Sequence, residues 1–306
     1  MTMEVRGIEE GVVGHHGERN GVVYSFQKAG DGPIITFRHG IGDDSTIFRN
    51  LVEFAYQQGS STLTLDSPGH GYSKQGSVIR EDPDNLSRIL DECGIEKTHL
   101  VGYSMGATQA LNFAHKAPDR TGKLLLLSPC FFDEEYLRLQ PFALIPVYAA
   151  LKKVWPSKNG DRTPKQTDFS KGHTDIYRAF LERVRATGIP NMLSALGELR
   201  EVGVPDCLYD IPNETRIVAG KQDQLARKAT TTLLKDQLLN STTTWLESGH
   251  LILKDDGIIL IDDVRNPHNE FTRKNLGKSK YSIPYFLNHG YEIIVDEYQV
   301  IMKKKA

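Results

Sequence analysis

The sequence predicts an α/β protein with a mostly parallel central sheet flanked by helices. Short apolar runs alternate with amphipathic helical patterns over residues 34–127, and the same alternation returns over residues 215–246. Strands and helices that alternate in this way form parallel βαβ units. The chain has 306 residues, which is enough for one large domain or two smaller ones.

The N-terminal part is expected to begin with an antiparallel hairpin. Its two strands are placed around Ile8–Val13 and Val22–Gln27, with GHHGERNG as the turn between them. His15 and His16 are therefore expected in an exposed turn. The apolar runs and the helical patterns that follow predict strands at 34–37, 62–65, 98–101 and 123–127, and helices at 47–57, 85–93 and 105–115.

Residues 130–205 interrupt the alternation, because they contain helical, aromatic-rich pieces without clear strands. They are interpreted as a helical insertion. Beyond them, the patterns predict a strand at 215–219, a helix at 224–239 and a strand at 242–246. The predicted organisation is a core in two parts (1–129 and 206–255), a cap (130–205) and a divergent C-terminal appendage (256–306).

Composition excludes several classes of partner. The 37 basic and 39 acidic residues give a net charge of −2, so nothing favours nucleic acid or an anionic membrane. The cysteines, Cys93, Cys130 and Cys207, are odd in number and widely spaced, which argues against a disulfide framework and against a zinc site. With no signal-peptide pattern and no apolar run near ~18 residues, we expect no membrane span and a cytoplasmic location.

A serine between two glycines, in VGYSMG, points to catalysis. Gly102-x-Ser104-x-Gly106 follows a predicted strand and precedes a predicted helix, which is the setting of a nucleophile elbow. The tight turn projects the hydroxyl above the sheet, and the glycines keep neighbouring atoms away. Capping a helix is the plain alternative for such a serine. The agreement of several motifs in order and spacing favours the nucleophile.

A serine nucleophile needs a base, and the base needs an orienting acid. Asp223 and His250 both follow predicted strands, and Ser104, Asp223 and His250 occur in the chain order expected for this arrangement. Two sets of rivals remain open. Those for the acid are Asp206 and Asp210, and those for the base are His268 and His289, whereas His39 and His70 are expected to structure loops.

An oxyanion hole is expected from two backbone N–H groups. One belongs to Ile41, in the loop HGIGDD after a predicted strand, and the other to Met105, directly after the serine. Tyr103, Phe131 and Phe132 are candidates for the wall of a substrate pocket, although aromatic residues at such positions also simply pack in a core.

Five segments together resemble the α/β-hydrolase superfamily, in its cap-bearing serine esterase and lipase-like branch. They are RHGIGDD, LDSPGHGYS, VGYSMGATQA, VAGKQDQL and LESGHL, and the resemblance covers roughly residues 20–255. It implies Ser104 as nucleophile, His250 as base, Asp223 as orienting acid, and the N–H groups of Ile41 and Met105 as the oxyanion hole. It implies no cofactor and no metal. A serine at the elbow, in place of an aspartate, argues against the dehalogenases and epoxide hydrolases of this fold.

The implied function is hydrolysis of a carboxylic ester or thioester through an acyl-enzyme on Ser104, with a small-molecule acyl substrate. The same three residues would also serve hydrolysis of a C–C bond, a lactone or an amide, because the pocket decides the substrate. A ligand-binding or partner module that keeps a hydrolase scaffold is an alternative of another class.

The tail departs from this family. Residues 257–261 and 291–303 have strand-like patterns, the latter as two strands around Asp296-Glu297, and residues 283–287 have the pattern of a helical turn. The tail faintly resembles the last strand, helix and closing β-hairpin of class I methyltransferases, without a glycine-rich cofactor loop upstream. We interpret it as a structural appendage or as a surface for a protein partner.

Overall fold

The fold is that of a computed structural model of the chain. The structure describes residues 13–130, 183–202, 208–223, 225–246, 249–250, 252, 259–261, 291–296 and 299–304. The chain divides into two compact units, Met1–His250 and Leu251–Ala306. Every residue of the predicted site that the structure describes lies in the first unit.

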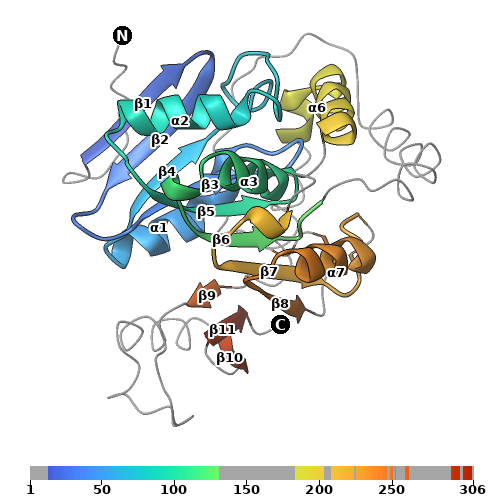
Figure 1. The fold of residues 1–306 in the computed structure, drawn as a ribbon. Helices are drawn as coiled ribbons and strands as arrows, with labels where there is room; N and C mark the ends of the chain where they lie inside the picture. The colour runs from blue at the N-terminus through green and yellow to red at the C-terminus, as the bar shows by residue number, and fades with distance from the viewer. Residues whose placement is uncertain are drawn as a thin grey trace. The chain divides into compact units, whose positions relative to one another are not determined.

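The first unit is built on an eight-stranded sheet in the order β1-β2-β4-β3-β5-β6-β7-β8 (Figure 1). Six strands, β4 to β8 in this order, run parallel, and the β1–β2 hairpin pairs antiparallel with β4. The bounds are β1 Val13–Arg19, β2 Val22–Lys28, β3 Ile34–Arg38, β4 Ser61–Leu65, β5 Thr98–Tyr103, β6 Thr121–Leu127, β7 Thr215–Gly220 and β8 Ser241–Leu246. The predicted α/β fold with a mostly parallel sheet is confirmed.

Helices pack on this sheet through their apolar stripes. The main helices are α1 Arg49–Gln57, α2 Asp82–Glu92, α3 Met105–Lys116, α6 Ile189–Val202 and α7 Lys228–Gln237, and single 3₁₀ turns lie at Ser45–Phe48, Pro118–Arg120 and Leu208–Asp210. One continuous apolar core joins α2, α3 and α7 to the strands, with Leu90, Phe113 and Leu234 among its fully buried members. Helix α1 begins after Phe48, whose ring packs 5.2 Å from that of Phe37 on β3.

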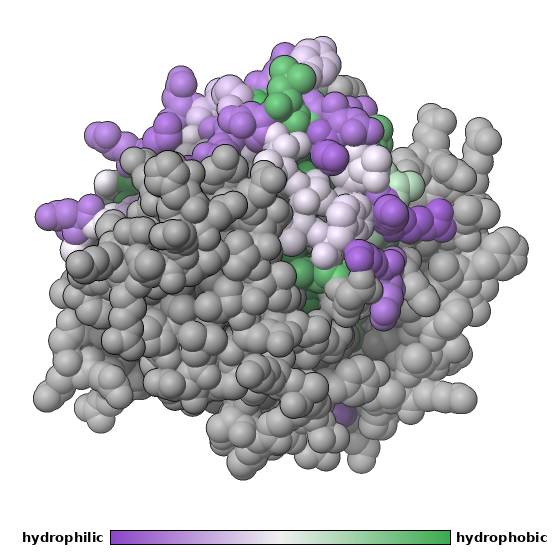
Figure 2. All heavy atoms as spheres, turned by 90° about the horizontal axis from the view of Figure 1, so that it is seen from below, coloured by the Kyte–Doolittle hydropathy of each residue, from purple (hydrophilic) through white to green (hydrophobic). Residues whose placement is uncertain are grey.

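Many apolar side chains of the described residues are buried between the sheet and the helices. On the face of the molecule shown in Figure 2, the visible described residues are mainly hydrophilic, with only small apolar groups between them. None of the helices in the described ranges has both the length and the apolar character needed to cross a bilayer.

The N-terminal hairpin is present, but the predicted position of its first strand and turn was wrong. Strand β1 covers most of the segment that was expected to be a turn, and it includes His15 and His16. The chain reverses over Asn20 and Gly21, both at positive φ, of 50° and 79°. An Asn-Gly pair favours the two-residue hairpin turn whose twist matches the strands. The expected first strand, apart from Val13, lies outside the described residues.

The other predicted strands and helices of the core are confirmed, with ends that move by a few residues. The largest shift is at α7, which begins at Lys228 and not at residue 224. Of the predicted insertion, the structure describes Cys130 and residues 183–202, and the latter are helical apart from a break at Gly188. Residues 131–182 and 203–205 of the insertion lie outside the described residues.

The second unit contains a three-stranded antiparallel sheet in the order β10-β11-β9. Its strands are β9 Ile259–Ile261, β10 Tyr291–Asp296 and β11 Gln299–Lys304. The strands expected in the tail are therefore present, whereas the helical turn expected at 283–287 lies outside the described residues. Its likeness to methyltransferases and its role as a partner surface stay predictions.

Candidate active site

Ser104 stands at a sharp turn between a buried strand and a helix. It follows the last residue of β5 and precedes the first residue of α3, with φ 53° and ψ −114°. Positive φ is costly for a residue with a side chain and persists only where the surroundings impose it. Here the backbone of Ser104 is held on both sides, because its N–H donates to Leu127 O (2.9 Å) and its carbonyl accepts from Ala107 N (3.0 Å).

The two flanking glycines are required by close backbone contacts. A Cβ atom on Gly102 would lie 2.6 Å from Ala107 Cα and would overlap the Gly106 carbonyl. One on Gly106 would overlap the Arg38 carbonyl and lie 2.9 Å from the Arg38 Cβ. Helix α3 therefore approaches β5 and β3 more closely than any side chain allows. This closeness is the physical reason for glycine two residues before and after the serine.

Three side chains predicted from the sequence meet at this turn. His250 Nε2 lies 2.9 Å from Ser104 Oγ, and His250 Nδ1 lies 2.8 Å from Asp223 Oδ2. The carboxylate can only accept, so Nδ1 carries a proton in this contact and Nε2 faces the serine hydroxyl as an acceptor. The arrangement allows the imidazole to take the serine proton and the carboxylate to stabilise the resulting charge.

Asp223 is itself held in place. Its Oδ1 accepts from Leu225 N and Ala226 N, each at 2.8 Å, which leaves Oδ2 to His250. Its rival Asp210 belongs to a 3₁₀ turn, and among the described residues it is Asp223 that contacts His250 Nδ1. The other rivals, Asp206, His268 and His289, lie outside the described residues.

The two expected oxyanion donors are next to Ser104. Met105 is the first residue of α3, where the backbone N–H of the first residue has no partner within the helix and lies at the positive end of the helix dipole. The loop with Ile41 lies close to Ser104, since a Cβ on the neighbouring Gly40 would lie 3.2 Å from Ser104 Cβ. Ile41 also packs against the small apolar cluster that contains Met105.

Tyr103 contacts His250, and its expected place in the wall of a pocket stays a prediction. Its side chain is 2% exposed, and its hydroxyl donates to the His250 carbonyl at 3.1 Å. The ring lies beside the imidazole, with centroids 5.5 Å apart. Phe131 and Phe132, the other pocket candidates, lie outside the described residues.

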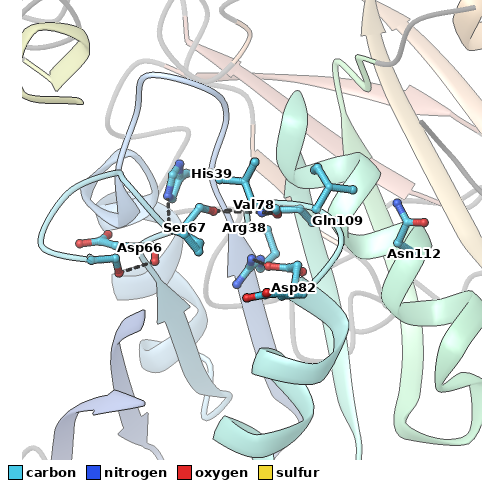
Figure 3. Close-up of polar contacts among 12 residues, drawn as sticks. Arg38, His39, Asp66, Ser67, Val78, Asp82, Gln109 and Asn112 are labelled. Atoms are coloured by element: carbon cyan, nitrogen blue, oxygen red, sulfur yellow. Dashed lines mark hydrogen bonds and ion pairs between the residues drawn. The ribbon is translucent and has the colours of Figure 1, made fainter. Parts of the chain in front are cut away.

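A buried polar network that sequence reasoning missed connects β3 with α2, and α3 with the loop after β4 (Figure 3). Arg38, the last residue of β3, forms an ion pair with Asp82 at the start of α2, and both side chains are almost fully buried. Gln109 on α3 donates to Ser67 Oγ (3.1 Å) and to Val78 O (2.8 Å). The local sequence around Arg38 and Asp82 gives no signal for this pair, because the two residues are 44 positions apart in the chain.

His39 and His70 are engaged in loop contacts. His39 Nε2 accepts from Ser67 N at 2.9 Å, and its Nδ1 donates to Gly40 O at 2.8 Å (Figure 3). His70 Nδ1 donates to Pro68 O at 2.9 Å. Burial lowers the pKa of each ring to about 4, so both are neutral near pH 7. Their ring contact at 5.3 Å joins the loop after β3 to the loop after β4.

Helix α6 is fastened to the core beside α3. Glu198 accepts from Ser77 Oγ (2.6 Å) and from Ile79 N (3.0 Å). Asn191 donates to Gly69 O at 3.0 Å. The C-terminal end of the predicted insertion is thus held by loops of the core. Across the described ranges, no group of three His, Cys, Asp or Glu side chains could hold a metal ion.

Known proteins show the same fold and similar segments. Residues 33–256 match the family model described as the alpha/beta hydrolase fold. A 2-hydroxy-6-oxononadienedioate/2-hydroxy-6-oxononatrienedioate hydrolase of Comamonas testosteroni is 38% identical over 111 residues, or 33% of this chain. A 2-hydroxy-6-oxo-6-phenylhexa-2,4-dienoate hydrolase of the same organism is 35% identical over 114 residues, or 34% of this chain. The matches span only 38% and 39% of these two relatives.

Solved structures extend the likeness in fold to most of the chain. A carboxylesterase of Nitrososphaera gargenis superposes with a TM-score of 0.60 at 16% identity, over 78% of this chain and 92% of that one. The enol-lactonase from Burkholderia xenovorans LB400 gives a TM-score of 0.58 at 16% identity, over 77% and 92%. The family model matches residues 33–256, which are most of this chain, and Ser104 stands at the turn expected of a nucleophile elbow. This chain therefore belongs to the α/β-hydrolase fold family.

Proposed function

We propose that the protein is a serine hydrolase that cleaves a small carbonyl compound through an acyl-enzyme on Ser104. One observation carries the proposal, the continuous chain of contacts from Ser104 Oγ through His250 to Asp223, at 2.9 and 2.8 Å. The strained turn at Ser104 adds support, because such strain is costly and is typical of functional sites.

In the proposed reaction, His250 Nε2 takes the proton of Ser104 as Oγ attacks the substrate carbonyl. The negative charge that develops on the carbonyl oxygen is stabilised by the N–H groups of Ile41 and Met105. His250 then gives its proton to the leaving group, which departs and leaves the acyl group on Ser104. A water molecule, deprotonated by His250, releases the acid and restores the hydroxyl.

An ester or thioester is the leading substrate class, because this chain of steps needs only a leaving group that His250 can protonate. The experiment compares Ser104→Ala with the wild type in turnover of p-nitrophenyl esters. Ser61→Ala is the matched control, because Ser61 is equally buried but lies at the start of β4, with its Oγ accepting from Ala29 N at 3.1 Å. We expect Ser104→Ala to lose activity and Ser61→Ala to keep it.

A fluorophosphonate separates this proposal from a ligand-binding role on a hydrolase scaffold. An activated serine reacts with it, so mass spectrometry should place the adduct on Ser104 in the wild type. A folded protein that remains unlabelled, or a Ser104→Ala variant with wild-type turnover, would contradict the proposal.

Hydrolysis of a C–C bond is the second candidate, favoured by the two Comamonas testosteroni relatives named above. The test is turnover of 2-hydroxy-6-oxo-6-phenylhexa-2,4-dienoate beside p-nitrophenyl esters, with Ser104→Ala in both assays. A higher kcat/KM for the dienoate would select C–C hydrolysis, and the reverse order would select ester hydrolysis.

A further inference from the structure

We propose that Tyr103 is a positioning residue that holds the loop of His250 against Ser104. The inference rests on the proposed function, because it assigns Tyr103 a role through the base of that reaction. Its hydroxyl donates to the backbone carbonyl of His250 at 3.1 Å, across 147 positions of sequence. The residue next to the nucleophile therefore fixes the backbone of the base.

The contacts of His250 divide into those that orient its ring and the one that holds its main chain. Strand β8 ends at Leu246, whose carbonyl accepts from Lys221 N at 2.8 Å. Gly249, directly before the histidine, has the backbone freedom of a residue without Cβ, and nothing lies within 4 Å of where that atom would be. The contacts of the imidazole with Ser104 and Asp223 orient the ring, whereas the bond from Tyr103 holds the main chain that carries it.

Tyr103 is well placed to act as a fixed support. It is the last residue of β5, its backbone is part of the central sheet, and its side chain is 2% exposed. Its ring lies against the loop after β3, since a Cβ on Gly40 would lie 3.1 Å from Tyr103 Cδ1. On its other side the ring lies beside the imidazole of His250, with 36° between the ring planes.

The hydroxyl is the part of this side chain that carries the inference. Phenylalanine would fill the same space and keep the ring contacts, but it would not donate to the His250 carbonyl. Loss of that bond lets the imidazole sample positions away from Ser104, and proton transfer depends steeply on such geometry. We expect Tyr103→Phe to lower the acylation rate about tenfold, with little change in KM.

The experiment measures the second-order rate of fluorophosphonate labelling, normalised to the folded fraction, together with kcat and KM on a p-nitrophenyl ester. Tyr24→Phe is the matched control. Tyr24 is a fully buried tyrosine of β2, in an apolar core cluster that contains none of the triad residues. If the only effect were the loss of a buried hydroxyl, Tyr103→Phe and Tyr24→Phe would lose similar stability and react at similar rates. Only Tyr103→Phe should slow labelling and lower kcat.

A spectroscopic readout tests the same inference without turnover. The Nδ1 proton of His250, held against Asp223 at 2.8 Å, is expected to give a downfield proton resonance that reports on this contact. We expect it to broaden or shift in Tyr103→Phe and to remain unchanged in Tyr24→Phe. A p-aminophenylalanine in place of Tyr103 keeps a donor at the same point and should restore both the resonance and the labelling rate.

The outcomes separate this inference from the proposed function. If the wild type is not labelled at Ser104, the function fails. If the wild type is labelled but Tyr103→Phe reacts at the same rate, or slows no more than Tyr24→Phe, the positioning role is wrong. Should Tyr103→Phe not fold, p-methylphenylalanine, which fills the space without a donor, is compared with p-aminophenylalanine. Equal rates for these two would likewise overturn the inference.

Discussion

The imidazole Nε2 of His250 lies 2.9 Å from the hydroxyl oxygen of Ser104, although 146 positions separate the two residues. The sheet explains this closeness. Ser104 follows β5, Asp223 follows β7 and His250 follows β8, and these strands run parallel within one sheet. Their carboxyl ends therefore meet at one edge, where the ligands of open α/β sheets bind.

Asp223→Asn should lower kcat by about 10⁴-fold while it leaves the fold unchanged. The asparagine oxygen can still accept from Leu225 N and Ala226 N, which hold Asp223 at 2.8 Å. Its amide nitrogen would then face His250 as a donor and favour the tautomer with the proton on Nε2. That tautomer cannot accept the proton of Ser104. Steady-state kinetics and a thermal melt check the result, and a loss below tenfold would contradict the role of Asp223.

Gly106→Ala should destabilise the protein by about 2–4 kcal/mol, because the new methyl group would overlap the backbone of Arg38. Gly197→Ala on α6 is the matched control. No atom lies within 4 Å of the Cβ that it adds, so the better helix propensity of alanine should raise stability by about 0.5–1 kcal/mol. Urea unfolding measures both. Equal effects of the two substitutions would show that the close approach of α3 to β3 is not a constraint.

The succession of strands along the chain and the three residues that follow strand ends could be predicted, because the signals are local. Apolar runs mark the strands, and Gly102, Ser104 and Gly106 mark the turn. The first strand was misplaced because GHHGERNG is rich in turn-forming residues, whereas the two-residue turn depends on Asn20 and Gly21 alone. Isolated polar residues give no comparable signal of which partners they meet in the fold.

Long-range side-chain pairings could not be predicted. Arg38 has the appearance of a polar residue at the end of a strand, and nothing local indicates that it meets Asp82, 44 positions away. Tyr103 was expected to line a pocket, because the pattern around the serine places it near the site without giving the direction of its ring. Such contacts follow from how β5, α2 and the loop of His250 are packed, which is a property of the whole fold.

The buried pair of Arg38 and Asp82 should respond unequally to loss of either partner. Asp82→Asn leaves a buried guanidinium that cannot lose its charge, so we expect a loss of about 3–5 kcal/mol in the free energy of unfolding. Arg38→Met leaves a carboxyl group whose pKa burial already raises to about 6. That group can take up a proton, so the loss should be smaller and should shrink further toward pH 5.

Denaturation with urea at pH 7.5 and pH 5 measures this asymmetry. The double variant Arg38→Met with Asp82→Leu removes both charges and should be more stable than Asp82→Asn alone. If the two single variants lose the same free energy at both pH values, the pair is not the desolvated ion pair described here.

His70 should make the protein sensitive to mild acid. Burial lowers the pKa of its ring to about 4, whereas the same side chain in the unfolded chain titrates near 6.5. Between these values the unfolded state binds more protons, so stability is lost as the pH falls from about 6.5 to 4. His70→Asn keeps a donor toward Pro68 O but has no ionisable ring. The advantage of the wild type over the variant should therefore shrink by roughly 1–2 kcal/mol between pH 7.5 and pH 5 in urea unfolding. An advantage that stays constant over this range would mean that His70 takes up its proton equally in the folded and unfolded states.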